Sequence, residues 1–217
     1  MCGRFTLISS PDTWPITGLA NHLPGFAPRY NIAPGQNIAV IRAAHDGSGP
    51  ELVPMRWGFV PHWVREDRPR LQPINARAET AAEKPMFRQA LSSHRCLIPA
   101  SGFYEWQGRQ GAKQPWYIRA NDSPIMLFAG IHDHFSGTGE PIDTVAILTR
   151  NADAQMAPIH ERMPVMVSPQ QVDDWFGPGY RNVLNADPAT PLASWPVSTR
   201  VNNTRNTDDG LTRPLET

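Results

Sequence analysis

Cys2 follows the initiator Met1 directly, and this placement gives the start of the chain an unusual chemical potential. Removal of Met1 ahead of so small a residue would leave Cys2 with a free α-amine and a thiol. The amine condenses with an aldehyde to an imine, and the thiol then closes onto the imine carbon to form a thiazolidine. An α-amine titrates near pH ~8, against ~10.4 for lysine, so part of it is nucleophilic at neutral pH. Taken alone, a cysteine at position two is more simply explained by chance.

A second polar segment contains Asn75 and Arg77, two residues apart. In an extended chain both side chains face the same side, where an amide and a guanidinium suit an anion or a carbonyl. A turn with a solvated arginine explains the pattern equally well.

Glu105 and His160 are the candidates for proton transfer. Glu105 lies in the aromatic run Gly102–Trp106, where desolvation would raise its pKa and suit it to carrying protons. The alternative is an exposed position on an alternating strand. His160 lies in a loop that ends at a proline, a usual place for a catalytic histidine, although a lone histidine is more often structural.

The composition favours a single globular domain, residues 1–217. We expect it in a reducing cytoplasm, or at the nucleoid if the protein is bacterial. There is no apolar run of membrane-spanning length and no secretion signal. Cys2 and Cys96 are the only cysteines, too few for a cysteine-rich zinc site. His132 and His134 have no third ligand at a set spacing. We therefore expect no metal, no cofactor and no membrane partner.

The charges balance overall but not locally. Residues 56–95 hold eight basic and four acidic side chains, a net of +4, and residues 140–217 hold six basic and ten acidic, a net of −4. The basic residues are almost all arginine, whose fork suits phosphate, although codon bias gives the same composition. The middle of the chain could present a basic face.

Short β-rich stretches dominate the chain and are bounded by turn residues. They predict an α+β fold of mainly short strands, forming a curled, barrel-like mixed sheet with a few peripheral helices. Helices are expected at Pro85–Ser92, at Gln170–Phe176 and after Ser10-Pro11, and a hairpin tip at Gly108–Gly111. The expected strands are Asn37–Ala43, Leu52–Trp57, Arg95–Ile98, Gly102–Trp106, Trp116–Arg119, Ile125–Ile131, Thr144–Leu148 and Pro164–Val167.

Several segments, in order along nearly the whole chain, resemble the SRAP (SOS response-associated peptidase) domain family. One departure is Phe128–Asp133, where the family often has a tryptophan soon after the glycine, and a small repacking is expected there. The segments that carry the resemblance are Met1–Phe5, Arg29–Pro34, Trp57–Pro61, Ile74–Thr80, Arg95–Ala100, Gly102–Trp106, Ile159–Pro164 and Arg200–Asn203.

The resemblance implies a protein that binds single-stranded DNA and crosslinks covalently to abasic sites, whose ring-opened sugar is an aldehyde. It implies that Cys2 forms the thiazolidine, that Glu105 moves protons, that Asn75 orients the linkage and that His160 protonates or steadies the opened sugar oxygen. A monomer is the default expectation. The resemblance also implies that Arg4 and Arg77 contact phosphates. The full set of residues expected to contact DNA is Arg4, Asn31, Trp63, Arg77 and Arg162.

Two other functions stay open at this point. Cys2, Asn75 and His160 could form a thiol peptidase, in which Cys2 acts as an N-terminal nucleophile, if only to remove Met1. The chain could also be a non-catalytic module that binds single strands. A free α-amine is required for thiazolidine chemistry and not for a thiol peptidase, so the amine separates the first two hypotheses.

Overall fold

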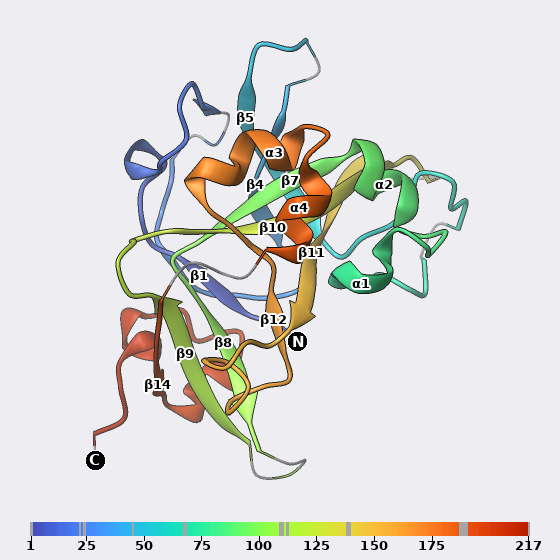
Figure 1. The fold of residues 1–217 in the computed structure, drawn as a ribbon. Coiled ribbons are helices and arrows are strands. Elements are labelled where there is room, and N and C mark those ends of the chain that lie inside the picture. The colour runs from blue at the N-terminus through green and yellow to red at the C-terminus, as the bar shows by residue number, and fades with distance from the viewer. Residues whose placement is uncertain are drawn as a thin grey trace.

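Strands make up most of the regular structure, as the β-branched and aromatic runs predict (Figure 1). The computed structural model describes residues 2–21, 23, 25–44, 46–66, 69–108, 111, 113–137, 140–186 and 191–216. Within these residues the strands form two sheets, one of nine strands and one of five.

The larger sheet closes into a barrel. Its strands run in the order β11 (Ile142–Asn151), β10 (Met126–Phe135), β7 (Arg95–Ala100), β4 (Asn37–Ala43) and β5 (Pro50–Trp57). The parallel pairing of β5 with β11, with Trp57 opposite Val145, joins the two ends. Trp57, Ile41, Leu97, Phe128 and Ile147 are at most 1% exposed and belong to one apolar core, which holds the barrel rigid.

Short strands extend the barrel at its rim, and two of them matter for the site. β6 (Asn75–Arg77) lies parallel to β11, and β12 (Arg162–Pro164) lies antiparallel to the same strand. β13 (Met166–Val167) pairs with β10, and β2 (Ala20–Asn21) pairs with β5. One long barrel strand therefore supports the segments of Asn75 and His160 together.

The smaller sheet has the order β14 (Leu192–Pro196), β9 (Gln114–Ala120), β8 (Gly102–Gln107), β1 (Phe5–Leu7) and β3 (Arg29–Ile32). The chain passes from β7 of the barrel to β8 of this sheet across a single residue, Ser101. Figure 1 shows β1 at the junction, with the barrel above it and β8, β9 and β14 below. The two sheets thus meet where the chain begins.

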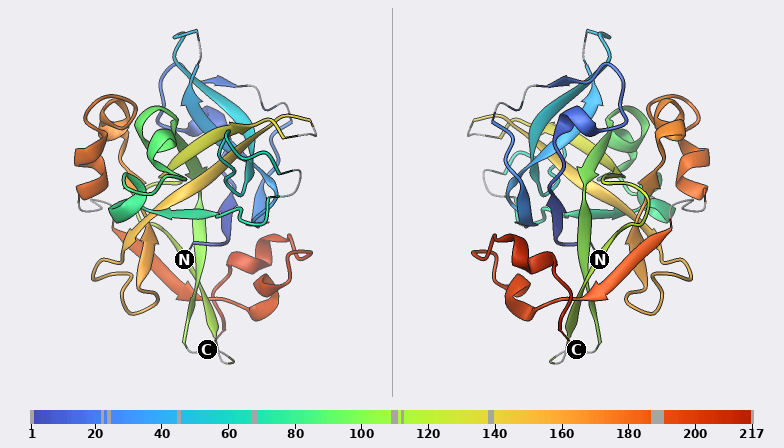
Figure 2. Two further views of the ribbon diagram at one scale, coloured as in Figure 1. Left: turned by 90° about the vertical axis from the view of Figure 1, so that its right-hand side faces the viewer. Right: turned by 90° about the vertical axis from the view of Figure 1, so that its left-hand side faces the viewer.

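The C-terminal segment covers the smaller sheet (Figure 2). Two 3₁₀ helices, Thr199–Asn202 and Asp209–Thr212, bring Val201 and Leu211 against Tyr104 and Tyr117 in a second, smaller apolar cluster. This packing buries the face of β8 that alternation assigns to Tyr104. The opposite face, with Phe103, joins the main core.

Four short helices in the described part of the chain gather on one side of the barrel (Figures 1 and 2). They are α1 (Ala78–Ala81), α2 (Arg88–Ser93), α3 (Val172–Phe176) and α4 (Tyr180–Asn185). This arrangement confirms the predicted α+β class with a curled, barrel-like sheet and few helices. None of the described helices is both long and apolar enough to cross a membrane.

Several predicted boundaries were wrong. The predicted strand Pro164–Val167 is split, because β12 pairs with β11 whereas β13 pairs with β10. The predicted helix Pro85–Ser92 begins only at Arg88, and Gln170–Phe176 starts as a 3₁₀ turn (Pro169–Gln171) under a capping box between Ser168 and Gln171. The turn after Ser10 is also a 3₁₀ helix, Pro11–Thr13.

Two further expectations concern strand ends. His132 and His134, whose spacing suits a loop or a strand end, lie at the end of β10, whose last residue is Phe135. Arg109 and Gln110, the middle of the predicted hairpin tip, lie outside the described residues.

Candidate active site

The pairing of β1 with β8 carries the start of the chain alongside Glu105. Phe5 lies opposite Phe103 and Thr6 opposite Gly102, and the backbone N–H of Tyr104 donates to the carbonyl of Arg4 at 2.9 Å. Because the strands are antiparallel, residues before Arg4 run along those after Tyr104. Cys2 reaches the site by this route and is fully buried there.

β6 brings Asn75 to the same place from the barrel side. The side-chain amide of Asn75 donates to the carbonyl oxygen of Cys2 at 3.0 Å. Its other polar atom, Oδ1, is buried and has no hydrogen-bond partner within the described residues. An unpaired buried oxygen is costly, so this atom is available to accept a hydrogen bond from a group that enters the site.

Glu105 is a buried carboxyl beside the thiol. It is 1% exposed, and desolvation raises its pKa, against the opposing influence of His160. Burial also raises the pKa of the Cys2 thiol, and the negative charge of Glu105 raises it further. Each group therefore favours its protonated form, and a deprotonated thiol would need a proton acceptor within the site.

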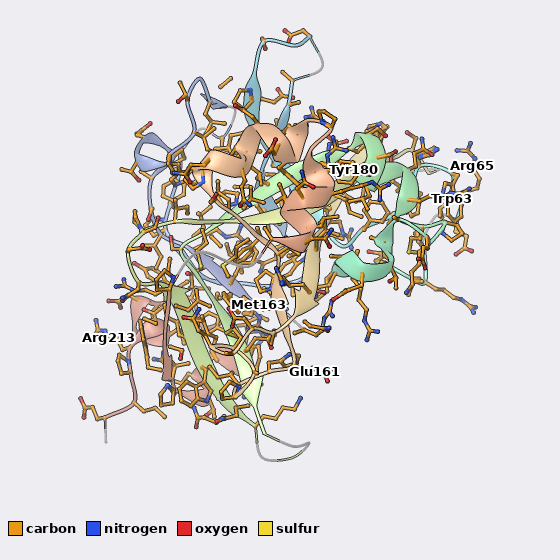
Figure 3. All side chains as sticks on the ribbon, in the orientation of Figure 1. Trp63, Arg65, Glu161, Met163, Tyr180 and Arg213 are labelled. Carbon is orange, nitrogen blue, oxygen red and sulfur yellow. The ribbon has the colours of Figure 1, made fainter. Side chains whose placement is uncertain are left out.

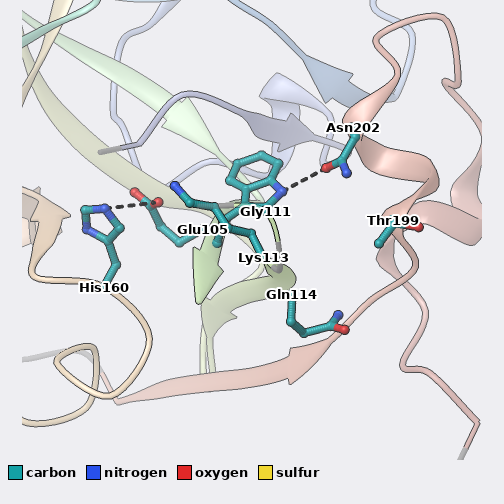
Figure 4. Close-up of a pocket in the computed structure, with 8 residues that line it drawn as sticks. Glu105, Gly111, Lys113, Gln114, His160, Thr199 and Asn202 are labelled. Carbon is teal, nitrogen blue, oxygen red and sulfur yellow. Dashed lines mark hydrogen bonds and ion pairs between the residues drawn. The ribbon is translucent and has the colours of Figure 1, made fainter. Parts of the chain in front are cut away.

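His160 lies at the mouth of the site, with its side chain 23% exposed. Its Nε2 is 3.9 Å from Oε2 of Glu105 (Figure 4). Its Nδ1 faces the backbone of Arg162, 2.9 Å from the N–H and 3.2 Å from the carbonyl. The backbone N–H is the nearer of the two groups and can only donate, so we assign the neutral ring the tautomer with its proton on Nε2, on the side of Glu105.

An open cleft of about 810 Å³ continues from Glu105 and His160 toward the C-terminal segment (Figure 4). Trp106 forms part of its wall and donates from Nε1 to Oδ1 of Asn202 at 2.8 Å. Sequence reasoning did not single out the other lining side chains, although Asn202 falls in the last motif of the resemblance. They are Lys113, Gln114, Thr199 and Asn202, with the backbone of Gly111.

Arg4 and Asn31, predicted to contact DNA, already have partners inside the protein. Arg4 donates from Nη1 to Oδ1 of Asn31 at 2.6 Å and to the carbonyl of Val201 at 2.8 Å. Asn31 is 4% exposed, and its Nδ2 lies within hydrogen-bonding distance of the carbonyls of Val201, Asn203 and Asn206. This pair joins β1 and β3 to the C-terminal segment. The amide donors of Asn31 are engaged by these carbonyls, and a contact of Asn31 with DNA stays a prediction.

Arg162 is also internal, at 6% exposure, and its guanidinium is held by Glu79 and the end of β11. Arg77 and Trp63, in contrast, are exposed, Trp63 by 50%. Figure 3 places Trp63 beside Arg65 at the edge of the molecule, well away from Glu161, the neighbour of His160. The structure therefore brings Cys2, Asn75, Glu105 and His160 together and leaves Trp63 on a separate part of the surface.

Within the residues that the structure describes, no three histidine, cysteine, aspartate or glutamate side chains are grouped so as to hold a metal ion.

The family model described as "SOS response associated peptidase (SRAP)" matches residues 1–204. The chain belongs to the SRAP family. This confirms the resemblance of its sequence motifs to that family.

Curated SRAP relatives match over most of their length. The abasic site processing protein YoqW of Bacillus subtilis is 36% identical, covering 97% of this chain and 98% of that one. YedK of Escherichia coli, with the same description, is 31% identical over 99% of this chain and 100% of its own. The chicken protein HMCES, also an abasic site processing protein, is 31% identical over 88% of this chain and 67% of its own.

Solved structures share the SRAP fold seen here. A protein of Bacteroides thetaiotaomicron superposes with a TM-score of 0.76 at 25% identity, covering 86% of this chain and 85% of that one. A phage-related protein of Bordetella bronchiseptica superposes with a TM-score of 0.70 at 29% identity, covering 90% and 94%.

Proposed function

We propose that this protein captures ring-opened abasic sites in single-stranded DNA by forming a thiazolidine with Cys2 after removal of Met1. The observation that carries the proposal is the meeting of Cys2, Asn75, Glu105 and His160 at one end of an open cleft. The names of the relatives, which are abasic site processing proteins, support the choice of substrate.

The reaction joins the aldehyde to both nucleophiles of Cys2 with loss of one water. The α-amine adds to the aldehyde carbon to give a carbinolamine, which loses its hydroxyl as water and becomes an imine. The sulfur then adds to the imine carbon, and the thiol proton passes to the nitrogen. No oxidant, reductant or metal is needed for this balance.

Glu105 is suited to the proton transfers in these steps. Loss of water requires a proton at the carbinolamine hydroxyl, and addition of sulfur requires removal of a proton from a thiol whose pKa is raised by burial. A carboxyl with a raised pKa is a better acid for the first step, and its conjugate base is a better acceptor for the second.

Asn75 and His160 hold the two reactants. Asn75 binds the carbonyl of Cys2, and its free Oδ1 can accept a hydrogen from the amine or from a sugar hydroxyl. Nε2 of His160, with its proton directed into the site, can donate to the sugar oxygen released by ring opening. Both side chains therefore hold the reacting groups in the orientation that the covalent step requires.

Weak phosphate contacts suffice for such a protein, because the covalent bond supplies retention. Exposed Arg77 and the cleft residue Lys113 are the cations placed to position the strand. Salt should therefore slow capture without releasing the product once it has formed.

The deciding experiment uses a single-stranded oligonucleotide with one abasic site and the Met1-processed protein, followed by a denaturing gel. A shifted band is expected with the native protein and none with Cys2→Ala. Cys2→Ser keeps the amine and lacks the sulfur, so its imine should appear only when borohydride traps it. A band of native intensity from Cys2→Ala without borohydride would refute the proposal.

A thiol peptidase is the second candidate, favoured by the description of the family as a peptidase. In that reaction the Cys2 thiol would attack a peptide carbonyl, at the least the one that precedes Cys2. A variant with an uncleavable residue ahead of Cys2 separates the candidates. It blocks the amine and should abolish crosslinking, whereas a thiol peptidase would retain cleavage of a peptide substrate.

A further inference from the structure

Glu79 and Arg162 form an ion pair that joins the two segments bearing Asn75 and His160. The contact is bidentate, at 2.7 Å between Nη1 and Oε1 and 2.8 Å between Nη2 and Oε2. Glu79 lies in α1, four residues after Asn75, and Arg162 lies in β12, two residues after His160. A bidentate arginine–carboxylate pair defines distance and orientation together.

The same guanidinium is anchored to β11, the barrel strand between the two segments. Nη1 also donates to Oδ1 of Asn151 at 2.6 Å, and Nη2 donates to the carbonyl of Thr149 at 2.7 Å. Oε1 of Glu79 in turn accepts from the backbone N–H of Asn151 at 3.1 Å. Arg162 is 6% exposed, so its guanidinium is sheltered from water, whereas the side chain of Glu79 is 42% exposed and its carboxylate is partly solvated.

The backbone of Arg162 carries this restraint to His160. Its N–H donates to Nδ1 of His160, which turns Nε2 toward Glu105. The next residue back, Glu161, is also tied down, because its carbonyl accepts from Ala152 N–H at 2.9 Å. The position of the guanidinium therefore sets the position of the N–H that selects the tautomer of His160.

We propose that Glu79 is a positioning residue for the crosslinking reaction, acting through Arg162 to hold His160 in its Nε2-protonated tautomer facing Glu105. Arg162 is then the internal strut that connects Glu79 to His160. This inference rests on the proposed function for its kinetic test, and on the structure alone for its spectroscopic test.

The alternative is that the pair only stabilises the fold, since loss of one partner leaves a buried charge. A control for this is Glu51, which accepts from Nε of Arg42 at 2.7 Å, with both side chains 15% exposed. That pair joins β4 to β5 and has no contact with the site. Glu79→Gln and Glu51→Gln are therefore the same chemical change in two ion pairs, only one of which reaches His160.

The kinetic test is a double-mutant cycle on single-turnover crosslinking. Glu79→Gln should slow adduct formation about tenfold in the native background and less than about twofold in a His160→Ala background, because it acts through that ring. Glu51→Gln should leave the rate unchanged. Equal slowing by Glu79→Gln in both backgrounds, or equal slowing by Glu51→Gln, overturns the inference.

The spectroscopic test needs no DNA. Nitrogen shifts of the His160 ring should show one tautomer, with the proton on Nε2, in the native protein and in Glu51→Gln. Glu79→Gln should show a mixture, and an unchanged single tautomer overturns the inference. If Glu79→Gln does not fold, Glu79→Asp, which keeps the charge but is too short for both contacts, takes its place with the same criteria. Failure of the native protein to crosslink defeats the proposed function but leaves this measurement decisive.

Discussion

The side chain of Asn75 donates to the carbonyl oxygen of Cys2 at 3.0 Å, across 73 positions of sequence. The bond ties the first residues of the chain to the rim of the barrel, because Asn75 belongs to β6 and β6 pairs with β11. The bond involves only the backbone carbonyl of Cys2, so it does not occupy the amine or the thiol. Removal of the bond should therefore affect the reaction more than the fold.

Asn75→Ala should slow crosslinking about fivefold, because one net hydrogen bond of about 1 kcal/mol no longer orients the nucleophile. Single-turnover gel assays with an abasic oligonucleotide measure this rate. Asn182→Ala, an exposed asparagine in α4, is the matched control and should react at the native rate. Native kinetics in Asn75→Ala would show that the bond has no part in orientation.

Glu105→Gln should crosslink more slowly and yet be more stable at neutral pH. The pKa of Glu105 is raised in the folded protein above its ordinary 4.5. A folded carboxyl with a raised pKa binds its proton more tightly than the unfolded one, so the stability falls as pH rises from about 4.5 through the folded value. Glutamine does not ionise, so the variant does not lose this stability as pH rises.

Thermal melting at two pH values tests the stability half of this prediction. The variant should melt about 2–4 °C above the native protein at pH 7.5, and the difference should shrink toward pH 4. A variant that melts lower at pH 7.5 would mean that the Glu105 carboxylate is stabilised in the fold, and its assignment as a proton carrier with a raised pKa would be wrong.

Local sequence signals predict the longer strands better than the short ones. Asn37–Ala43 coincides with β4 because its β-branched residues are buried on a strand with partners on both sides. β1, β3 and β6 have only three or four residues each and no comparable run. They exist because distant strands pair with them, such as Phe5 with Ile32 and Phe103, and no local pattern encodes those partners.

The same reasoning applies to the site. Residue chemistry makes Cys2, Asn75, Glu105 and His160 candidates, but each has a structural alternative and the sequence does not show that they meet. The DNA contacts of Asn31 and Arg162 follow only from the family resemblance, which does not show how either side chain is placed. Their burial depends on partners 170 and 83 positions away, the carbonyl of Val201 and the carboxylate of Glu79. Long-range pairing of this kind has no local signature.

Arg77→Ala should weaken non-covalent binding of single-stranded DNA and reduce its dependence on salt. One phosphate contact fewer releases fewer counterions, so the slope of log affinity against log salt should fall by about 0.7. Binding should be measured by anisotropy in a Cys2→Ala background, where no adduct forms. Arg213→Ala, an exposed arginine on the C-terminal segment away from the site (Figure 3), should leave the slope unchanged. Equal slopes for Arg77→Ala and the parent would remove Arg77 from the DNA surface.

His132 should make the barrel sensitive to acid. Burial lowers the pKa of His132 from 6.5 to about 4, with smaller contributions from the stacked ring of His94 and from Arg42, against Asp143 and Asp133. The unfolded chain therefore binds a proton at higher pH than the folded protein does. Stability is fully present above pH 6.5 and is lost as pH falls toward 4, by up to about 3 kcal/mol.

His132→Phe retains an aromatic ring against His94 but cannot titrate, so it separates this contribution from packing. Denaturant unfolding at pH 7.5 and pH 5 should give a smaller difference in free energy for His132→Phe than for the native protein. Ile131→Val, a core change in the same strand that removes no titratable group, should lower stability equally at both pH values. If His132→Phe showed the same difference in unfolding free energy between pH 7.5 and pH 5 as the native protein, the acid sensitivity would have to arise from other groups, because this variant lacks the imidazole of His132.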